Sequence, residues 1–144
     1  MMRLIGLMLL LVGVNTFADN HLLPVVAIEN YFSSFNKEDR DGLNEAADSP
    51  FIFVIGGEPR SYDRYGDAVD FEGLKASGWS YSLINSKELI YSDDLTAAVR
   101  MNFSRFNESD EVISTTDSVY LLVRRDGEWK VKGGFLNGTL TLGK

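Results

Sequence analysis

The sequence predicts an α+β domain, with helices first and a curved, mostly antiparallel sheet after them. Two observations predict this class: apolar residues recur at helical spacing near the start, and longer β-rich runs separated by turn residues fill the second half. No linker-like composition and no internal repeat interrupt residues 19–144. We therefore expect a single domain there, with the helices covering one face of the sheet.

The first predicted helix spans residues 22–36, where one face carries apolar side chains at steps of three or four and Pro24 suits the first turn. A second helix should begin after Asp39, a good N-cap residue, and end before Pro50. These two helices are expected to form a hairpin. A third helix is predicted over residues 67–76.

The strands are predicted from β-rich runs and the turns between them. A short run at 51–55 ends at Gly56-Gly57, after which the chain is polar and turn-like through Tyr65. In the later run 95–106, the odd positions from Leu95 to Phe103 are apolar and should face the helices, so the even positions face solvent or a second subunit. Antiparallel neighbours are expected among the later strands, at residues 79–91, 95–106, 112–125 and 128–135.

The N-terminus has the zones of a secretory signal peptide, residues 1–18. Arg3 precedes an apolar run that ends at Val14, and a small-residue stretch ends at Ala18. The apolar run is shorter than the roughly 20 residues that span a bilayer, so we expect cleavage after Ala18 rather than a permanent anchor. The mature chain is expected to be periplasmic or secreted, without a membrane attachment.

Composition narrows the expected partners and chemistry. The formal net charge is −7, so nucleic acid is not an expected partner. There is no cysteine, and the single histidine, His21, precedes the folded part, which excludes His- or Cys-based triads and thiolate zinc sites. No phosphate-binding glycine motif occurs, so no cofactor is expected, and any catalysis must use carboxylates, Tyr, Arg or Lys.

Two groups of residues raise the question of ion binding. Cleavage after Ala18 would leave a chain beginning Asp19-Asn20-His21, whose nitrogens suit square-planar Cu(II) or Ni(II); chance placement of His21 is the alternative. Cations cluster late in the chain, and we interpret them as a solvated sheet face and strand ends, with an anion-binding patch as the alternative. They are Arg100, Arg105, Arg124, Arg125, Lys130 and Lys132.

Three stretches, in their order along the chain, resemble the nuclear transport factor 2-like superfamily, which includes SnoaL-like proteins and ketosteroid isomerase. Residues 31–48 are similar to its opening helical hairpin, residues 57–61 (GEPRS) to the loop after its first strand, and residues 126–131 (DGEWKV) to its last hairpin. The resemblance covers about residues 22–135. It implies a cone-shaped domain with a pocket between sheet and helices, and frequent dimerisation through the sheet.

The resemblance to ketosteroid isomerase implies roles residue by residue. Tyr31 matches the tyrosine that donates a hydrogen bond to the developing oxyanion. Val54 stands where that enzyme has its aspartate general base, and Leu121 stands at or near its protonated aspartic acid. Because valine and leucine can neither take nor donate a proton, steroid isomerase activity is not expected.

Two residues are candidates for catalysis by another route. Tyr31 flanks the apolar face of the first helix, so its hydroxyl either enters a pocket or makes one hydrogen bond in the core. Asp117 is the first choice for a catalytic carboxylate, because a buried carboxylate on the inner face of the sheet could act as a general base. A paired, structural aspartate is the alternative, with Arg100 and Asn102 as expected cross-strand neighbours.

Ligand-binding residues are predicted around the segment that roofs a pocket in this fold. Aromatic walls with a few polar tips suit a small hydrophobic ligand, although the same rings also fit core and lid packing. Arg60 could hold a ligand carboxylate bidentately, with a solvated loop arginine as the alternative. The predicted lining is Trp79, Tyr81, Tyr62, Tyr65, Val54 and Leu121.

Three functions remain open from the sequence. The leading hypothesis is an exported binding domain for a small apolar or amphipathic molecule. A cofactor-free lyase, isomerase or hydrolase would require Tyr31 and Asp117 to reach one cavity. A structural or interaction module would have its cone filled by the protein's own side chains.

Overall fold

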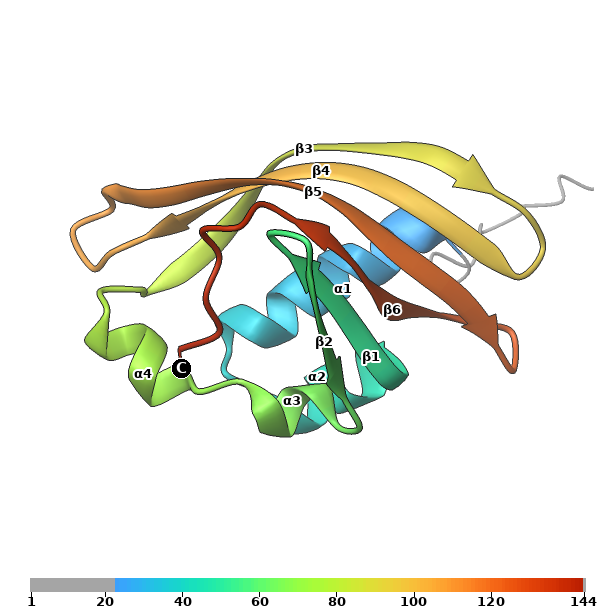
Figure 1. Ribbon diagram of the computed structural model, residues 1–144, viewed down its shortest axis with the longest axis horizontal. Helices are drawn as coiled ribbons and strands as arrows, with labels where there is room; N and C mark the ends of the chain where they lie inside the picture. Colours follow the sequence, from blue (N-terminus) through green and yellow to red (C-terminus); the bar gives the residue numbers. More distant parts are fainter. Residues whose placement is uncertain (1–22, 144) are drawn as a thin grey trace, which may run out of the picture.

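The computed structural model describes residues 23–143, so the predicted leader, its cleavage site and His21 lie outside the described residues. The helices lie on the concave side of a six-stranded sheet (Figure 1). The strand order is β2-β1-β6-β5-β4-β3, with parallel pairing between β1 and β6 and antiparallel pairing elsewhere. The predicted α+β class with a curved, mostly antiparallel sheet is confirmed.

The first two helices match their sequence signals. Helix α1 spans Pro24–Asn36 with Pro24 in its first turn, and it buries the side chains of Ile28, Tyr31, Phe32 and Phe35. Helix α2 spans Arg40–Ala46 and begins after Asp39, whose carboxylate accepts a hydrogen bond from the backbone N–H of Gly42 at 2.9 Å. That cap satisfies one of the unpaired donors at the start of α2.

Strands β1 (Ala47–Ile55) and β2 (Glu58–Tyr62) form a hairpin. Its two-residue turn has positive φ at both Gly56 (59°) and Gly57 (84°), which glycine adopts without strain. The sequence predicted a turn-like chain here, and that prediction is wrong for β2. An edge strand that is almost wholly exposed and contains Pro59 carries no alternating apolar pattern by which to recognise it.

The predicted third helix is divided in two. Helix α3 spans Tyr65–Ala68 and α4 spans Phe71–Ala76. Asp70 interrupts the helix because its carboxylate caps α4, accepting a hydrogen bond from the N–H of Gly73 at 3.0 Å. Buried side chains from both short helices join the core beneath the sheet.

The long strands are β3 (Tyr81–Ser92), β4 (Thr96–Phe106), β5 (Val112–Arg125) and β6 (Glu128–Leu136). The predicted inward face of β4 is confirmed for Ala97 through Phe103, whereas Leu95 lies in the preceding turn and is 65% exposed. The parallel contact of β6 with β1 is close: a Cβ on Gly133 would lie 1.7 Å from the carbonyl oxygen of Ile52. Only glycine fits at that crossing.

The C-terminal segment, residues 137–143, leaves β6 and runs back across the mouth of the cone to α4 (Figure 1). The carbonyl of Leu142 accepts a hydrogen bond from the N–H of Asp70 at 3.0 Å, and the side chains of Leu140 and Leu142 are buried. This segment therefore closes the space between the sheet and the helices. Over residues 23–143, no helix has both the length and the apolar character needed to cross a membrane.

Candidate ligand-binding site

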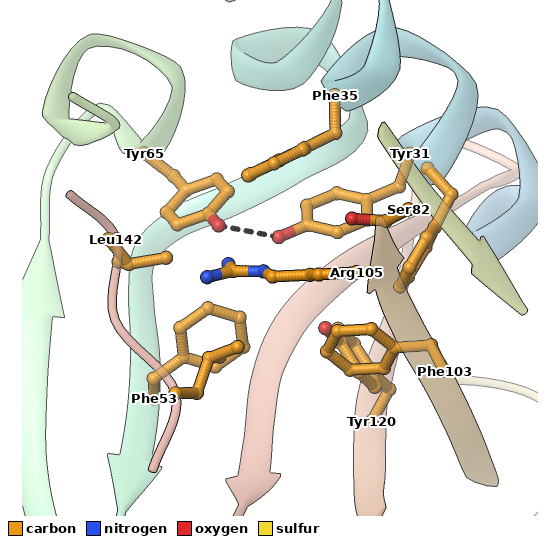
Figure 2. A pocket seen from close by; sticks show the side chains of 11 residues that line it. Tyr31, Phe35, Phe53, Tyr65, Ser82, Phe103, Arg105, Tyr120 and Leu142 are labelled. Carbon is orange, nitrogen blue, oxygen red and sulfur yellow. Dashed lines mark hydrogen bonds between the residues drawn. The ribbon is translucent and has the colours of Figure 1, made fainter. Parts of the chain in front are cut away.

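An aromatic chamber lies inside the cone, between α1 and the inner face of the sheet (Figure 2). Its free volume is about 20 Å³, which is room for a single water molecule. Most of its wall consists of aromatic rings, and two leucines of the C-terminal segment close it. The lining residues are Tyr31, Phe32, Phe35, Phe53, Tyr65, Ser82, Phe103, Arg105, Tyr120, Leu140 and Leu142.

The fold holds this wall rigidly. Tyr31, Phe32 and Phe35 come from the buried face of α1, and the other rings come from β1, β4, β5 and the start of α3. The end of α1 is fixed to β3, because the side-chain amide of Asn36 both donates to the carbonyl of Ser82 and accepts from its N–H, each at 2.8 Å. The helix therefore cannot shift along the sheet without breaking two hydrogen bonds.

Arg105 is the only charged residue of the chamber lining. Its residue is 6% exposed, and its side chain runs across the chamber with the guanidinium close to Leu142 (Figure 2). Nη1 donates a hydrogen bond to the backbone carbonyl of Thr141 at 2.6 Å, whereas Nε is buried without a hydrogen-bond partner. Among residues 23–143, no carboxylate forms an ion pair with this guanidinium.

Burial lowers the pKa of Arg105, an effect that its three tyrosine neighbours oppose. The guanidinium nevertheless stays protonated at neutral pH, because the ordinary pKa of arginine lies far above 7. The chamber thus contains a positive charge without a negative partner. Such a charge costs several kcal/mol to bury unless a ligand or a partner compensates it.

Three tyrosines surround this charge: Tyr31, Tyr65 and Tyr120. The hydroxyl of Tyr31 donates to the hydroxyl of Tyr65 at 2.7 Å (Figure 2). Burial is the main cause that raises the pKa of all three, and the positive charge of Arg105 opposes it at each. They are therefore neutral hydrogen-bonding groups at physiological pH.

The lining includes no histidine, aspartate or glutamate, so no residue there has the ordinary pKa of a general base at neutral pH. Its polar atoms instead suit the recognition of an oxyanion: a guanidinium and phenolic hydroxyls in an apolar, water-poor enclosure. Across residues 23–143, no group of three or more acidic or histidine side chains is arranged to hold a metal ion.

The predicted site residues are distributed over several places. Tyr31 and Tyr65 line the chamber. Trp79 is buried beside it, where its ring lies 5.4 Å from that of Phe35 and its indole N–H donates to Ser82 Oγ at 3.0 Å. Tyr81 lies further out, stacked on Phe106, with its hydroxyl donating to Asp110 at 2.7 Å.

Two further predicted binding residues lie outside the chamber lining. Tyr62 is half-buried and packs its ring against Tyr65, with centroids 5.9 Å apart. Arg60 is exposed on β2, at the edge of the sheet. The chamber's arginine is on β4 instead, at position 105.

The expectation that Asp117 faces the helices is wrong. Thr116, Ser118 and Tyr120 are buried on the inner face of β5, so Asp117 points to the opposite, outer face, where it accepts a hydrogen bond from Asn102 at 2.7 Å. The predicted cross-strand contact with Asn102 is confirmed. Asp117 cannot share a cavity with Tyr31, which contradicts the catalytic pair that the sequence suggested.

Val54 and Leu121 also lie on the outer face rather than in the chamber. In β1 the side chains of Phe51, Phe53 and Ile55 point inward, which turns Val54 outward. Together with neighbours on β5 and β6, these residues form an apolar outer patch. The outer patch consists of Ile52, Val54, Val119, Leu121 and Phe135.

The prediction that Arg105 is one of the solvated cations is wrong, because this residue is buried and lines the chamber. The signal that could have found it is parity: Arg105 continues the odd-numbered face of β4 that includes Val99, Met101 and Phe103. The closing role of the C-terminal segment was also missed, because Leu140 and Leu142 lie beyond the last predicted strand, in a short run without regular periodicity.

Comparisons with known proteins agree with this architecture. The family described as NTF2-like protein (DUF6841) matches residues 26–136. A ketosteroid isomerase-like protein from Erwinia carotovora atroseptica has 16% identity and a TM-score of 0.62, covering 87% of this chain and 100% of the other. No curated protein matches the sequence.

Two further solved structures are similar in fold. An NTF-2 like protein of unknown function from Shewanella oneidensis has 14% identity and a TM-score of 0.64, covering 78% of this chain and 94% of the other. A protein with a cystatin-like fold from Nostoc punctiforme has 9% identity and a TM-score of 0.64, covering 78% of this chain and 86% of the other. At these identities the likeness concerns the fold alone.

Proposed function

Because this chain belongs to the family described as NTF2-like protein (DUF6841), we propose that it binds a small amphipathic molecule in the cone between its sheet and its helices. The polar end of the molecule contacts Arg105 and the tyrosine hydroxyls. Its apolar body packs among the phenylalanine rings of the chamber. Binding, rather than turnover, is the function that this lining supports.

The observation that carries the proposal is the buried guanidinium of Arg105 with an unpartnered Nε. A domain that needed only a filled core would be expected to place an apolar side chain here, because replacing buried charges with packed apolar groups is often stabilising. Groups that cost stability cluster at functional sites. A ligand with an acceptor oxygen would supply the missing partner.

A second candidate, a structural module with a filled cone, is favoured by one observation. The free volume of about 20 Å³ is far below the roughly 300 Å³ at which typical ligand pockets begin. The two candidates differ in whether the closing leucines of the C-terminal segment can leave. A binding domain requires that they do, whereas a module keeps them in place.

We also propose that the chain is exported and that it forms a dimer. Residues 1–18 export the chain, and two copies associate through the outer faces of their sheets. The apolar outer patch supports association, since Phe135 is 56% exposed between Val54 and Val119 of the neighbouring strands. The zones of the N-terminus support export.

Nuclear magnetic resonance with mixtures of small aromatic and aliphatic compounds, both neutral and acidic, tests the binding proposal. Binding in the cone should shift the backbone amide signals of Tyr31, Phe53 and Tyr120 together. As a control, the signals of Leu89 and Tyr91, exposed on β3, should change little. Absence of any change at chamber residues across the mixtures would favour the filled-cone module.

A further inference from the structure

The C-terminal segment occupies the place that a ligand's polar end would need. The Thr141 carbonyl accepts the hydrogen bond from Arg105 Nη1, and Leu140 and Leu142 fill the chamber on either side of it. A backbone carbonyl carries only a partial charge, so it compensates a buried guanidinium less well than a carboxylate does. The segment therefore leaves the Arg105 charge only partly satisfied.

Resting on the binding function proposed above, we infer that the cone takes an aromatic carboxylic acid, whose carboxylate replaces the Thr141 carbonyl at Arg105 when residues 137–143 move out. The acid's oxygens pair with Nη1 and Nη2, the two parallel donors at the end of the guanidinium, while its ring enters the space that the leucines leave. The C-terminal segment is thus a built-in competitor of the ligand.

The chemistry of the chamber selects this class of ligand. The planar guanidinium matches the planar fork of a carboxylate, with two parallel hydrogen bonds. Arg105 is the only cation in the lining, so one negative charge is balanced and a dianionic phosphate would remain undercompensated. The rings of Phe53, Phe103 and Tyr120 offer edges and faces to an aromatic body.

The C-terminal segment is attached through backbone hydrogen bonds and side-chain packing that a displacing ligand must replace. Its backbone bonds to the body of the domain include the Asn137 N–H to the Asp117 carbonyl, the Leu142 carbonyl to the Asp70 N–H and the Thr141 carbonyl to Arg105. The two leucines pack in the core, and Gly143 lies close to Asp70 and Leu74. A ligand that satisfies Arg105 better than Thr141 does removes one of these ties directly.

Isothermal titration of the full chain with 2-naphthoate and with its uncharged analogue 2-naphthamide tests the inference. The Leu140→Ser/Leu142→Ser variant, which weakens the closing contacts, should bind the acid about tenfold tighter than the wild type, since competition by the segment is reduced. Leu83→Ser/Leu89→Ser is the matched control at exposed leucines on β3, and it should leave the affinity unchanged.

The acid should bind at least about tenfold tighter than the amide, and Arg105→Met should abolish that preference, because a charge-assisted pair is lost. Arg100→Met on the outer face should retain it. Circular dichroism establishes that each variant is folded. If the Leu140→Ser/Leu142→Ser protein does not fold, the milder variant Leu142→Ala replaces it.

The outcomes separate the inference from the binding function itself. Equal affinity for acid and amide in folded chains would overturn the carboxylate assignment and leave ligand binding intact. Equal affinity of the wild type and the loosened variants would overturn the competition by residues 137–143. Binding of neither compound to any variant, while chamber signals shift with other compounds of the mixtures, would overturn the aromatic-acid assignment and leave the binding function standing.

Discussion

Arg105 Nη1 donates a hydrogen bond of 2.6 Å to the carbonyl of Thr141, and this contact joins the end of β4 to the C-terminal segment. It places the chamber's one cation against the segment that closes the cone. Burying this cation is costly because its Nε has no hydrogen-bond partner, and it is also the charged group of the lining that suits an acid. An apolar residue at position 105 would therefore favour stability, whereas the arginine favours binding of an acid.

Replacing Arg105 with methionine should leave the free energy of unfolding unchanged or raise it. Methionine keeps an unbranched apolar chain and removes a buried charge without an ionic partner, at the cost of one hydrogen bond to Thr141. Chemical denaturation measures the change. Arg100→Met, which removes an exposed contact to Glu88 at 3.6 Å, is the control and should alter stability by less than about 1 kcal/mol.

A loss of more than about 2 kcal/mol in Arg105→Met would show that the guanidinium stabilises the fold. The residue would then be structural, and the argument from its unsatisfied burial would no longer support ligand binding.

The buried tyrosines predict a limit to stability at alkaline pH. The folded-state pKa values of Tyr31, Tyr65 and Tyr120 lie above the ordinary value of 10.0, mainly through burial. Their contribution is thus fully present below about pH 10 and is lost as the pH rises from there toward the folded-state values, because the unfolded chain ionises first. Tyrosinate absorbance and circular dichroism should show these three ionising only as the chain unfolds.

The Tyr65→Phe variant provides the check on that titration, because it should remove one of the late-ionising tyrosines. Ionisation of all six tyrosines near pH 10 in a chain that remains folded would contradict the burial of the chamber hydroxyls.

The lowered pKa of Asp48 predicts how the stability of the fold changes at acid pH. Its carboxylate accepts from Arg125 Nε at 3.1 Å and from Lys132 Nζ at 3.0 Å, and the hydrogen bond from Arg125 is the main cause that lowers its pKa. A lowered folded-state pKa stabilises the fold above the ordinary value of 3.8, and this contribution is lost as the pH falls through the folded-state pKa.

Asp48→Asn should accordingly lower the free energy of unfolding at neutral pH, by no more than about 1 kcal/mol because Arg125 is exposed. The difference from the wild type should disappear in strong acid. Glu108→Gln, an exposed position in the β4–β5 turn, is the control. A deficit that stays constant from neutral to acid pH would mean that the charge of Asp48 is not its source.

Elements with strong local signals were predicted well from the sequence. Asp39 as an N-cap, Pro24 in a first turn and the alternating run in β4 each depend on neighbours along the chain, and each matches the structure. The hairpin turn at Asp126-Gly127 has positive φ at both residues, as that dipeptide favours. Helix caps, turns and strand alternation depend on residues that are neighbours along the chain, so they can be predicted from a single sequence.

The candidate site was harder to predict, because it is formed by residues that lie far apart in the sequence. The inward face of β5 was assigned from its apolar residues, but the even positions carry Thr116, Ser118 and Tyr120 inward, and this reversed the placement of Asp117 and Leu121. The contact between Arg105 and Thr141 joins a strand end to an irregular tail. Nothing in the sequence around Arg105 or around Thr141 indicates that these two residues are in contact; only the folded chain brings them together.

The outer patch predicts an interface between two copies of the chain. Phe135→Asp places a charge at the centre of this patch and should convert a dimer to a monomer, because the charge would be buried without a partner. Analytical ultracentrifugation measures the change in mass. Leu95→Asp, in the exposed turn before β4, is the control and should leave the mass unchanged. A wild type that is monomeric at all concentrations tested would contradict the interface.

The central claim is that the guanidinium of Arg105 exchanges the Thr141 carbonyl for the carboxylate of an aromatic acid. The most direct measurement follows the Arg105 Nε–H and Thr141 amide signals by nuclear magnetic resonance while 2-naphthoate is added to the full chain. We predict that both signals shift along one saturation curve, and that 2-naphthamide leaves the Nε–H signal in place. An Arg105 signal that does not move while other residues report binding of the acid would contradict the account.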